Sequence, residues 1–218
     1  MVDSKIQITL CFKVNKMNQK ISDDLAHIRS MMERSSRFLS LSGLSGVGAG
    51  IVGLVTGVLA IAILKKYQID FSTDYVFNEK LVFELFVLGA SALLLAIFCG
   101  CYFTIRKSKK LGLQIWTATT KKILIQLAIP LAVGGVFVLA LLQYNLYGLV
   151  AGTTLIFYGL ALVNAEKYTY SDIKYLGFLE IILGCLSLFF IGKGLIFWTI
   201  GFGVLHIVYG IILYRKYK

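Results

Sequence analysis

Six apolar runs dominate the chain, and each is about as long as a helix that crosses a lipid bilayer. A membrane-spanning helix needs roughly 20 mostly apolar residues, since the hydrocarbon core is about 30 Å thick. Backbone groups inside the bilayer must be hydrogen-bonded internally, which a helix achieves, and the runs lack the polar–apolar alternation of barrel strands. They therefore predict an all-α membrane protein with a six-helix transmembrane bundle. The predicted spans are 41–64, 81–105, 123–142, 146–163, 175–192 and 194–214.

The composition agrees with this reading. Hydrophobic residues make up 58% of the chain and charged residues 15%, against roughly 45–50% and about 25% in soluble domains. The net charge of +11 would suggest a nucleic-acid partner in a soluble protein. Here the Lys and Arg residues lie between the apolar runs, as they do in cytoplasmic loops. We therefore expect the lipid bilayer as partner and no nucleic acid.

The loop charges predict the orientation of the spans. If the N-terminus is inside, the cytoplasmic segments hold 18 Lys and Arg residues and the outer segments hold 4. Cytoplasmic loops of membrane proteins are enriched in these residues. We expect a multi-pass protein with both termini in the cytoplasm.

Residues 1–40 form a separate N-terminal segment before the transmembrane domain, 41–218. Apolar residues recur there at helical spacing, which predicts an amphipathic cytoplasmic helix over about 20–39. Such a helix can lie on the membrane surface, or it can pair with a protein partner or its own copy in a homo-oligomer. Residues 1–16 fit no element, so we expect translation to begin at Met17 or these residues to be dispensable. The candidate contact residues are Leu25, Ile28, Met32, Arg29, Arg34 and Arg37.

Small residues recur every four positions in the first and fourth spans. This spacing lets another helix backbone approach closely. We expect it to serve packing inside the bundle, and the alternative is an oligomer interface or a flexible gate. The glycines concerned are Gly46, Gly50, Gly53, Gly57, Gly148 and Gly152.

Ionisable residues inside the spans are costly and become functional candidates for that reason. Glu180 lies thirteen residues before Lys193 and His206 thirteen after it. Antiparallel helices joined by a tight turn at Lys193 would place the two side chains at similar depth, so we expect them to contact each other. Gln126 and Pro130 reach a comparable depth and complete a candidate polar site. Its role is either a structural hydrogen bond or the handling of an ion or proton.

Glu84 is a weaker candidate near the outer end of the second span. Lys80 precedes it by four residues, so the two side chains can pair on one helix face.

The sequence carries no known catalytic motif and no CxxC pair among its four Cys, and we expect no enzymatic activity, metal or cofactor. We expect a non-enzymatic scaffold, sensor or regulator. The alternative is a small-solute or ion transporter that uses the site around Glu180 and His206.

Three stretches resemble a family of uncharacterised bacterial multispanning inner-membrane proteins. They are 29–38 (RSMMERSSRF), 39–46 (LSLSGLSG) and 201–210 (GFGVLHIVYG). The resemblance extends over most of the chain from Met17 onward. It implies the bacterial inner membrane as location and transfers no residue roles.

Overall fold

The computed structural model describes residues 42–67, 69 and 78–217, together with Met17, Ser22, Asp24 and Leu25. The chain divides into two units, Met1–Arg37 and Phe38–Lys218. In the first unit the four described residues are helical. The predicted contact residues Ile28, Met32, Arg29, Arg34 and Arg37 lie outside the described residues.

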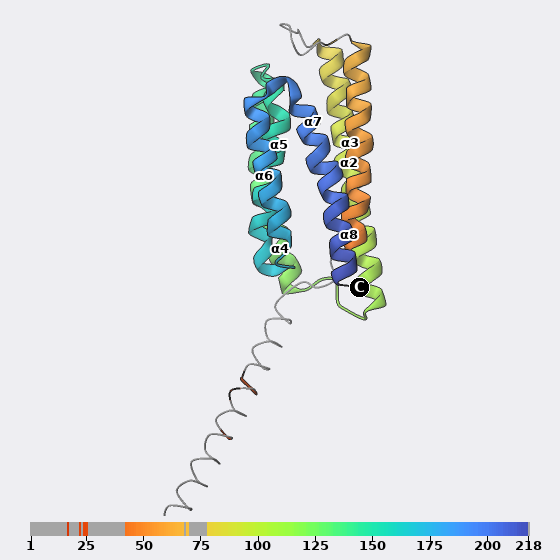
Figure 1. Ribbon diagram of the computed structural model, residues 1–218, viewed down its shortest axis with the longest axis vertical. Coiled ribbons are helices and arrows are strands. Elements are labelled where there is room, and N and C mark those ends of the chain that lie inside the picture. Colours follow the sequence, from red (N-terminus) through yellow and green to blue (C-terminus); the bar gives the residue numbers. More distant parts are fainter. Residues whose placement is uncertain are drawn as a thin grey trace, which may run out of the picture. The chain divides into compact units, whose positions relative to one another are not determined.

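Every regular element in the described part of the second unit is helical (Figure 1). Its long helices match the predicted spans with shifts of a few residues at most ends. The elements are α2 (Gly43–Lys66), α3 (Glu79–Lys110), α4 (Ala118–Gln143), η1 (Tyr147–Leu149), α5 (Val150–Ala165), η2 (Glu166–Tyr168), α6 (Ile173–Phe189), η3 (Ile191–Lys193), α7 (Gly194–Thr199), η4 (Ile200–Leu205) and α8 (His206–Lys216).

Within the described residues, five helical segments are long and apolar enough to cross a membrane. They are Gly43–Lys66, Glu79–Lys110, Ala118–Gln143, Tyr147–Tyr168 and Gly194–Lys216. This finding confirms an all-α fold with membrane-capable helices. The remaining helix, α6, has 17 residues, which is the lower end of the usual range for a span. It is shorter than the predicted span 175–192, because the chain leaves the helix at Phe190 and turns through η3.

Local sequence signals fix several helix ends. The Asn78 side chain accepts a hydrogen bond from the Leu81 amide at 2.8 Å, which caps the start of α3. At α4 the side chains of Thr117 and Thr120 bond reciprocally to each other's backbone, as in a capping box. Asn145 adopts a positive φ of 59° in the turn after α4, a conformation that Asn tolerates better than most residues.

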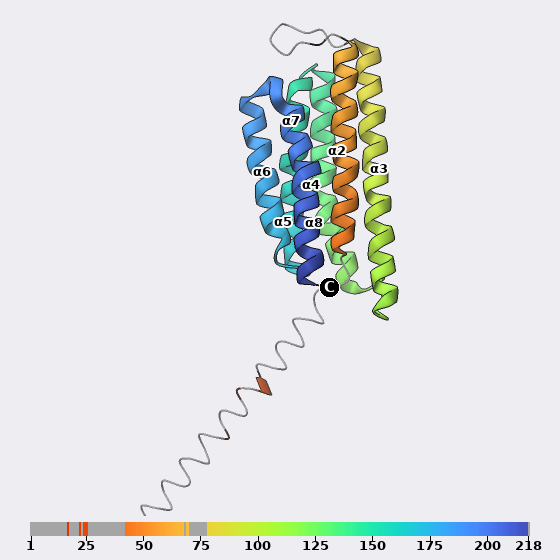
Figure 2. The same cartoon turned by 45° about the vertical axis from the view of Figure 1, so that its right-hand side comes forward.

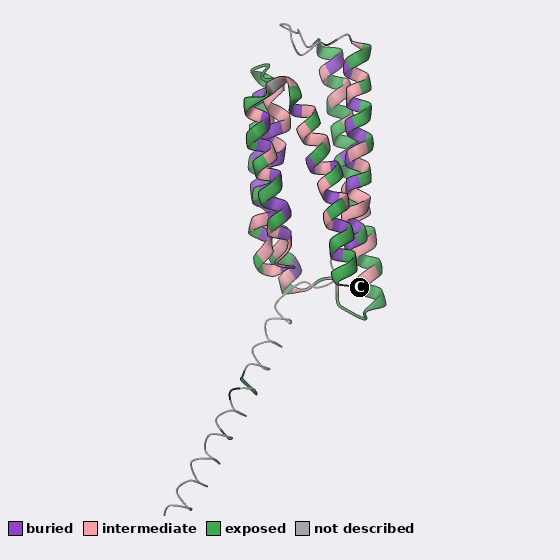
Figure 3. Cartoon of the chain, viewed as in Figure 1, coloured by how far each residue is buried: buried purple, intermediate pink, exposed green. Residues whose placement is uncertain are grey.

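Exposed residues lie along the length of the helices in Figure 3, and many of them are large and apolar. Large apolar side chains face outward on α3 and α4, and Leu94, Phe98 and Val136 are each at least two-thirds exposed. The buried positions of α2 are mostly small, with Gly50, Gly53 and Gly57 among them. Because an apolar exterior is unfavourable in water and favourable against lipid tails, this distribution fits a bundle surrounded by lipid.

The last helical rod of the bundle, formed by α7, η4 and α8, packs against both of the other helix groups, which are α4–α5–α6 and α2–α3. α4 packs on α5 and α5 on α6, while α2 packs on α3. α7 contacts both α5 and α6, and α8 runs along α2 (Figures 1 and 2). The predicted span 194–214 is confirmed as one membrane-capable helical segment, Gly194–Lys216, and a π-helical turn, η4, lies in its middle. Such turns insert an extra residue into a helix and occur frequently at functional sites.

Glycine contacts hold α2 against this last rod. A Cβ at Gly50 would lie 2.8 Å from the Gly203 carbonyl oxygen, and one at Gly210 would lie 2.7 Å from the Gly43 carbonyl oxygen. Gly46, Gly53 and Gly57 face the same rod. The glycine ridge of α2 therefore packs inside the bundle, which is the first of the two roles that its spacing predicts.

α5 and α6 are packed in the same way. Gly152 and Gly184 face each other, and so do Gly159 and Gly177: at each of the four, an added Cβ would lie within 3.0 Å of the opposite carbonyl oxygen. Of the predicted pair in the fourth span, Gly152 therefore packs against α6. Gly148 lies before α5 in η1, with its carbonyl oxygen near Gly194.

Candidate functional site

Glu180 and His206 meet in the interior of the bundle, as the sequence predicts. Glu180 lies in the middle of α6 and His206 is the first residue of α8. The Nδ1 atom of His206 lies 3.3 Å from Oε1 of Glu180, and the two side chains are 6% and 0% exposed. A side chain with no accessible surface touches no water-sized space, so the carboxyl group of Glu180 is dry.

The histidine ring has a second contact at each nitrogen. Nδ1 lies 3.0 Å from the carbonyl oxygen of Gly201, and Nε2 lies 2.8 Å from the hydroxyl oxygen of Tyr158. A carbonyl oxygen only accepts hydrogen bonds, so Nδ1 carries the proton and donates to Gly201. In the neutral ring Nε2 then accepts from the Tyr158 hydroxyl. These contacts place a proton on Nδ1, and the protonation of Nε2 follows the direction of its hydrogen bond with the Tyr158 hydroxyl.

Two aromatic rings pack against this histidine. The Phe202 ring is stacked on it with centroids 5.8 Å apart, and the Tyr158 centroid lies 5.3 Å away. Together with the hydrogen bonds, these contacts fix the ring plane of His206 and keep Nδ1 close to Glu180.

The carboxyl group of Glu180 has no hydrogen-bond partner for either oxygen among the described residues. Its nearest donor, Nδ1 of His206, is already bonded to Gly201. Unpartnered polar groups in a protein interior are rare, since each costs about 1–3 kcal/mol. A carboxyl group that is retained under these conditions is a functional candidate.

The π-helical turn shapes the space around this carboxyl group. A Cβ at Gly201 would lie 2.5 Å from Oε2 of Glu180 and 2.6 Å from a methyl carbon of Leu155. A larger residue at this position would therefore displace the ends of the Glu180 and Leu155 side chains. The same turn places the Gly201 carbonyl within reach of the His206 ring, so one irregular segment positions both partners.

No hydrogen bond links Gln126 or Pro130 to the Glu180–His206 pair among the described residues, and their place in the site stays a prediction. Both lie on α4, which packs against α5, and neither is within hydrogen-bonding distance of Glu180 or His206 among the contacts of the described residues. Pro130 is buried and Gln126 is half-buried. The polar group that completes the site is Tyr158, from α5.

Glu84 also has other partners than predicted. It accepts a hydrogen bond from the Tyr67 hydroxyl at 2.8 Å and pairs with Lys66 at 3.5 Å, both at the end of α2. The pairing with Lys80 on its own helix is not among the ion pairs of the described residues. The hydrogen bond to Glu84 is also the main reason that the pKa of Tyr67 is raised.

A second polar cluster ties the end of α8 to the start of α6. The Nζ atom of Lys216 lies 2.7 Å from Oδ2 of Asp172, and the Tyr217 hydroxyl donates to the same oxygen at 3.0 Å. Lys107 of α3 donates to the Tyr217 carbonyl at 3.3 Å. The hydrogen bond from Lys216 holds the pKa of Asp172 below its usual value. This cluster closes the end of the bundle at which α8 terminates.

Among the residues that the structure describes, no group of three or more His, Cys, Asp and Glu side chains is placed to hold a metal ion. Comparison of the chain with protein-family models, curated proteins and solved structures found no match. The site must therefore be interpreted from its own chemistry.

Proposed function

We propose that the chain is a six-span protein of a bacterial inner membrane, with both termini in the cytoplasm and α6 as the sixth span. The support is the excess of Lys and Arg in the segments on one side and the close glycine packing of α6 on the membrane-capable α5. Reporter fusions at residue 218 and within 65–80 test this topology. The C-terminal fusion should report the cytoplasm, and an external signal there would mean that α6 does not cross.

We propose further that the protein is a non-enzymatic sensor or regulator that responds to protonation of Glu180 and His206. The observation that carries this proposal is the Glu180 carboxyl group, which is fully buried, has no hydrogen-bond partner in the described part of the chain and lies 3.3 Å from His206 Nδ1. Ionisable groups buried within membrane helices are costly and are typically retained for a function. An imidazole beside a carboxyl group can hold one proton or two, so the pair has more than one protonation state available to it.

Protonation must rearrange the hydrogen bonds of this site. A protonated imidazole donates from both nitrogens, whereas in the neutral form Nε2 accepts from Tyr158. On protonation the Tyr158 hydroxyl must therefore turn to accept, and the imidazolium favours an ionised Glu180 beside it. The two states differ in charge, in hydrogen-bond direction and in the attraction between α6 and α8.

The position of the pair lets this local change reach the whole bundle. Glu180 belongs to α6, and His206 begins α8, which packs on α2. The π-helical turn η4 between α7 and α8 is a point where the helix can shift its register at low cost. A change in the attraction between His206 and Glu180 would therefore shift the position of α8 relative to α6. Because α2 packs on α8, α2 would move with it.

We propose that Tyr209 gives the pair access to protons from the cytoplasmic side. It lies three residues after His206, on the same face of α8, and its hydroxyl is buried without a hydrogen-bond partner among the described residues. Tyr209 and Tyr158 pack against one apolar cluster that includes Ile173, the residue next to Asp172. The Tyr209 hydroxyl, by accepting one proton and releasing another, would connect the Glu180–His206 pair with the end of the bundle at Asp172.

Amide hydrogen exchange of residues 194–217 at about pH 5 and pH 8, corrected for intrinsic rates, tests the sensor proposal. The wild type should show a pH-dependent change in protection around η4, and Glu180→Gln should lose it. Glu84→Gln is the matched control, because it changes another intramembrane glutamate that has its own partners; it should keep the change. A pH response that survives in Glu180→Gln would contradict the proposal.

The output of such a sensor would pass through the N-terminal segment. Its predicted apolar stripe, which includes Leu25, Ile28 and Met32, suits a protein partner, a second copy or the membrane surface. Changing Leu25 and Ile28 to Asp should release this helix and increase proteolysis between residues 17 and 40. Equal sensitivity of variant and wild type would count against this role.

A small-solute or ion transporter coupled to protons is the second candidate. It is favoured by the arrangement in which α7–η4–α8 contacts both α2 and the α5–α6 pair, since relative movement of two helix groups around a buried charged site is a common transport mechanism. With a dry Glu180, the described conformation would be a closed one. Liposomes with an internal pH dye distinguish the two: proton entry that requires Glu180 indicates transport, and its absence favours the sensor.

A further inference from the structure

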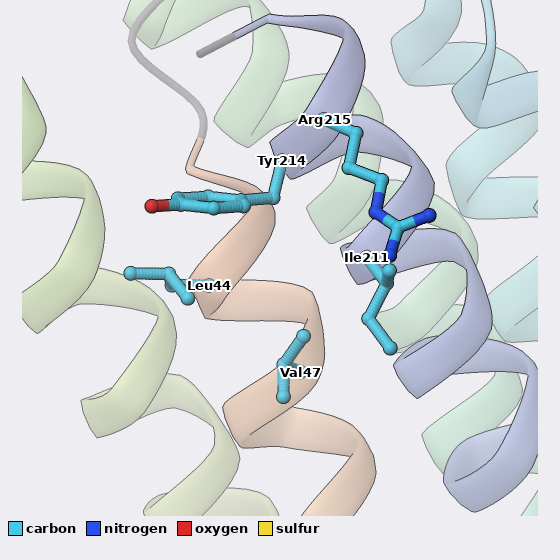
Figure 4. A pocket seen from close by; sticks show the side chains of 5 residues that line it. All are labelled: Leu44, Val47, Ile211, Tyr214 and Arg215. Carbon is cyan, nitrogen blue, oxygen red and sulfur yellow. The ribbon is translucent and has the colours of Figure 1, made fainter.

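An open groove lies on the outer surface of the bundle, between the first turns of α2 and the last turns of α8. Its volume is about 480 Å³, within the range of small-molecule sites. Figure 4 shows Tyr214 over Leu44 on one side and Arg215 beside Ile211 on the other, with Val47 next to Leu44 along α2. The groove is thus lined by apolar side chains and one guanidinium group.

Close backbone packing produces this groove. Gly43 and Gly210 bring the two helices into direct contact, while the larger side chains on either side of the contact diverge. Leu44, Ile211 and Tyr214 are each about 40% exposed. Apolar side chains that remain this accessible next to a contact line leave a channel that a flexible hydrocarbon chain can fill.

Arg215 supplies the positive charge of this groove. Lys216, its neighbour, pairs with Asp172, whereas Arg215 has no ion pair among the described residues. It lies one residue before the end of α8, where a helix that spans the bilayer meets the lipid headgroups. Guanidinium binds phosphate with two parallel hydrogen bonds, which suits it to a phospholipid headgroup.

We propose that this groove binds an anionic phospholipid, with an acyl chain along Leu44, Val47 and Ile211 and the phosphate on Arg215. Charge complementarity selects this occupant: the predicted N-terminal helix carries Arg29, Arg34 and Arg37 and would place like charges next to Arg215. Basic pockets between membrane helices are known recognition sites for anionic lipids. The proposal does not depend on protonation of Glu180.

The test measures lipid binding to the full chain in an uncharged detergent, by native mass spectrometry and by the shift in unfolding temperature. Phosphatidylglycerol should bind more tightly than phosphatidylcholine. Arg215→Gln should weaken phosphatidylglycerol binding about tenfold or more, because it removes a charge-assisted hydrogen bond. Arg215→Lys should restore part of the binding.

Lys110→Gln is the matched control, since it removes the same charge from the end of α3 without changing the groove. Equal weakening by both variants, or equal binding of the two lipids, would overturn the proposal. So would an Arg215→Gln variant that dissociates a dimer in lipid-free detergent, because the occupant would then be a second copy. Glu180→Gln should leave lipid binding unchanged, so this test and that of the sensor proposal fail independently.

Discussion

Replacing Glu180 by Met should stabilise the protein, against the usual effect of a core substitution. Met has a similar length and no polar oxygens, so it removes two buried oxygens that lack hydrogen-bond partners. No new unpaired group results, because His206 keeps Gly201 on Nδ1 and Tyr158 on Nε2. An unsatisfied buried polar group costs about 1–3 kcal/mol, and we expect a gain of that size.

Thermal unfolding in detergent measures this gain. For a chain of this size, 1 kcal/mol corresponds to about 2–4 °C, so the unfolding temperature should rise by several degrees. Glu84→Met is the control: its carboxylate accepts from Tyr67, so the same substitution should be neutral or destabilising there. His206→Met should also destabilise, because it leaves the Tyr158 hydroxyl without its acceptor.

The result that would refute this reasoning is a loss of about 3–5 kcal/mol in Glu180→Met. A loss of this size is typical when one partner of a buried ion pair is removed. It would mean that the resting protein holds an imidazolium at His206 beside an ionised Glu180, which contradicts the neutral pair on which this prediction rests.

Two further predictions concern packing and pH. Gly159→Ala should destabilise the protein by about 1–3 kcal/mol, because the new methyl group would lie 2.5 Å from the Gly177 carbonyl oxygen. Gly89→Ala is the control and should be neutral, since no described atom lies within 4 Å of the added methyl group. Equal unfolding temperatures of the two variants would contradict this prediction. The pKa of Asp172 is lowered in the folded state, so its contribution to stability is complete above the unfolded value of about 3.9 and is lost as the pH falls through the folded value. Unfolding temperatures should therefore decrease less on acidification in Asp172→Asn than in the wild type, and parallel curves would show that the pairing with Lys216 contributes nothing.

The helices were predictable because the bilayer imposes a simple length and polarity rule on each span. The Glu180–His206 contact was predictable for a related reason: a short turn at Lys193 fixes the depth of two antiparallel helices. The glycine ridge of α2 indicated a close contact, and its spacing left open whether the partner was another helix of the bundle or a second chain.

The details of the site depend on features that helical periodicity does not reveal. The π-helical turn changes the register by one residue, so it directs the Gly201 carbonyl at His206 in a way that a regular helix model misses. Tyr158 is one of several aromatic residues in its apolar run, and its contact with His206 becomes evident only from the packing of α5. Gln126 and Pro130 lie on α4, which packs against α5, and the side-chain hydrogen bond to His206 comes from Tyr158 of α5.

Infrared difference spectroscopy of the protein in lipid between about pH 5 and 8 tests the central claim, a titrating Glu180–His206 pair, most directly. A buried protonated carboxyl group gives a C=O stretching band separate from that of exposed carboxyls. The account predicts that this band changes with pH in the wild type, disappears in Glu180→Gln, shifts in His206→Gln and is retained in Glu84→Gln. A difference spectrum that is identical in wild type and Glu180→Gln would contradict it.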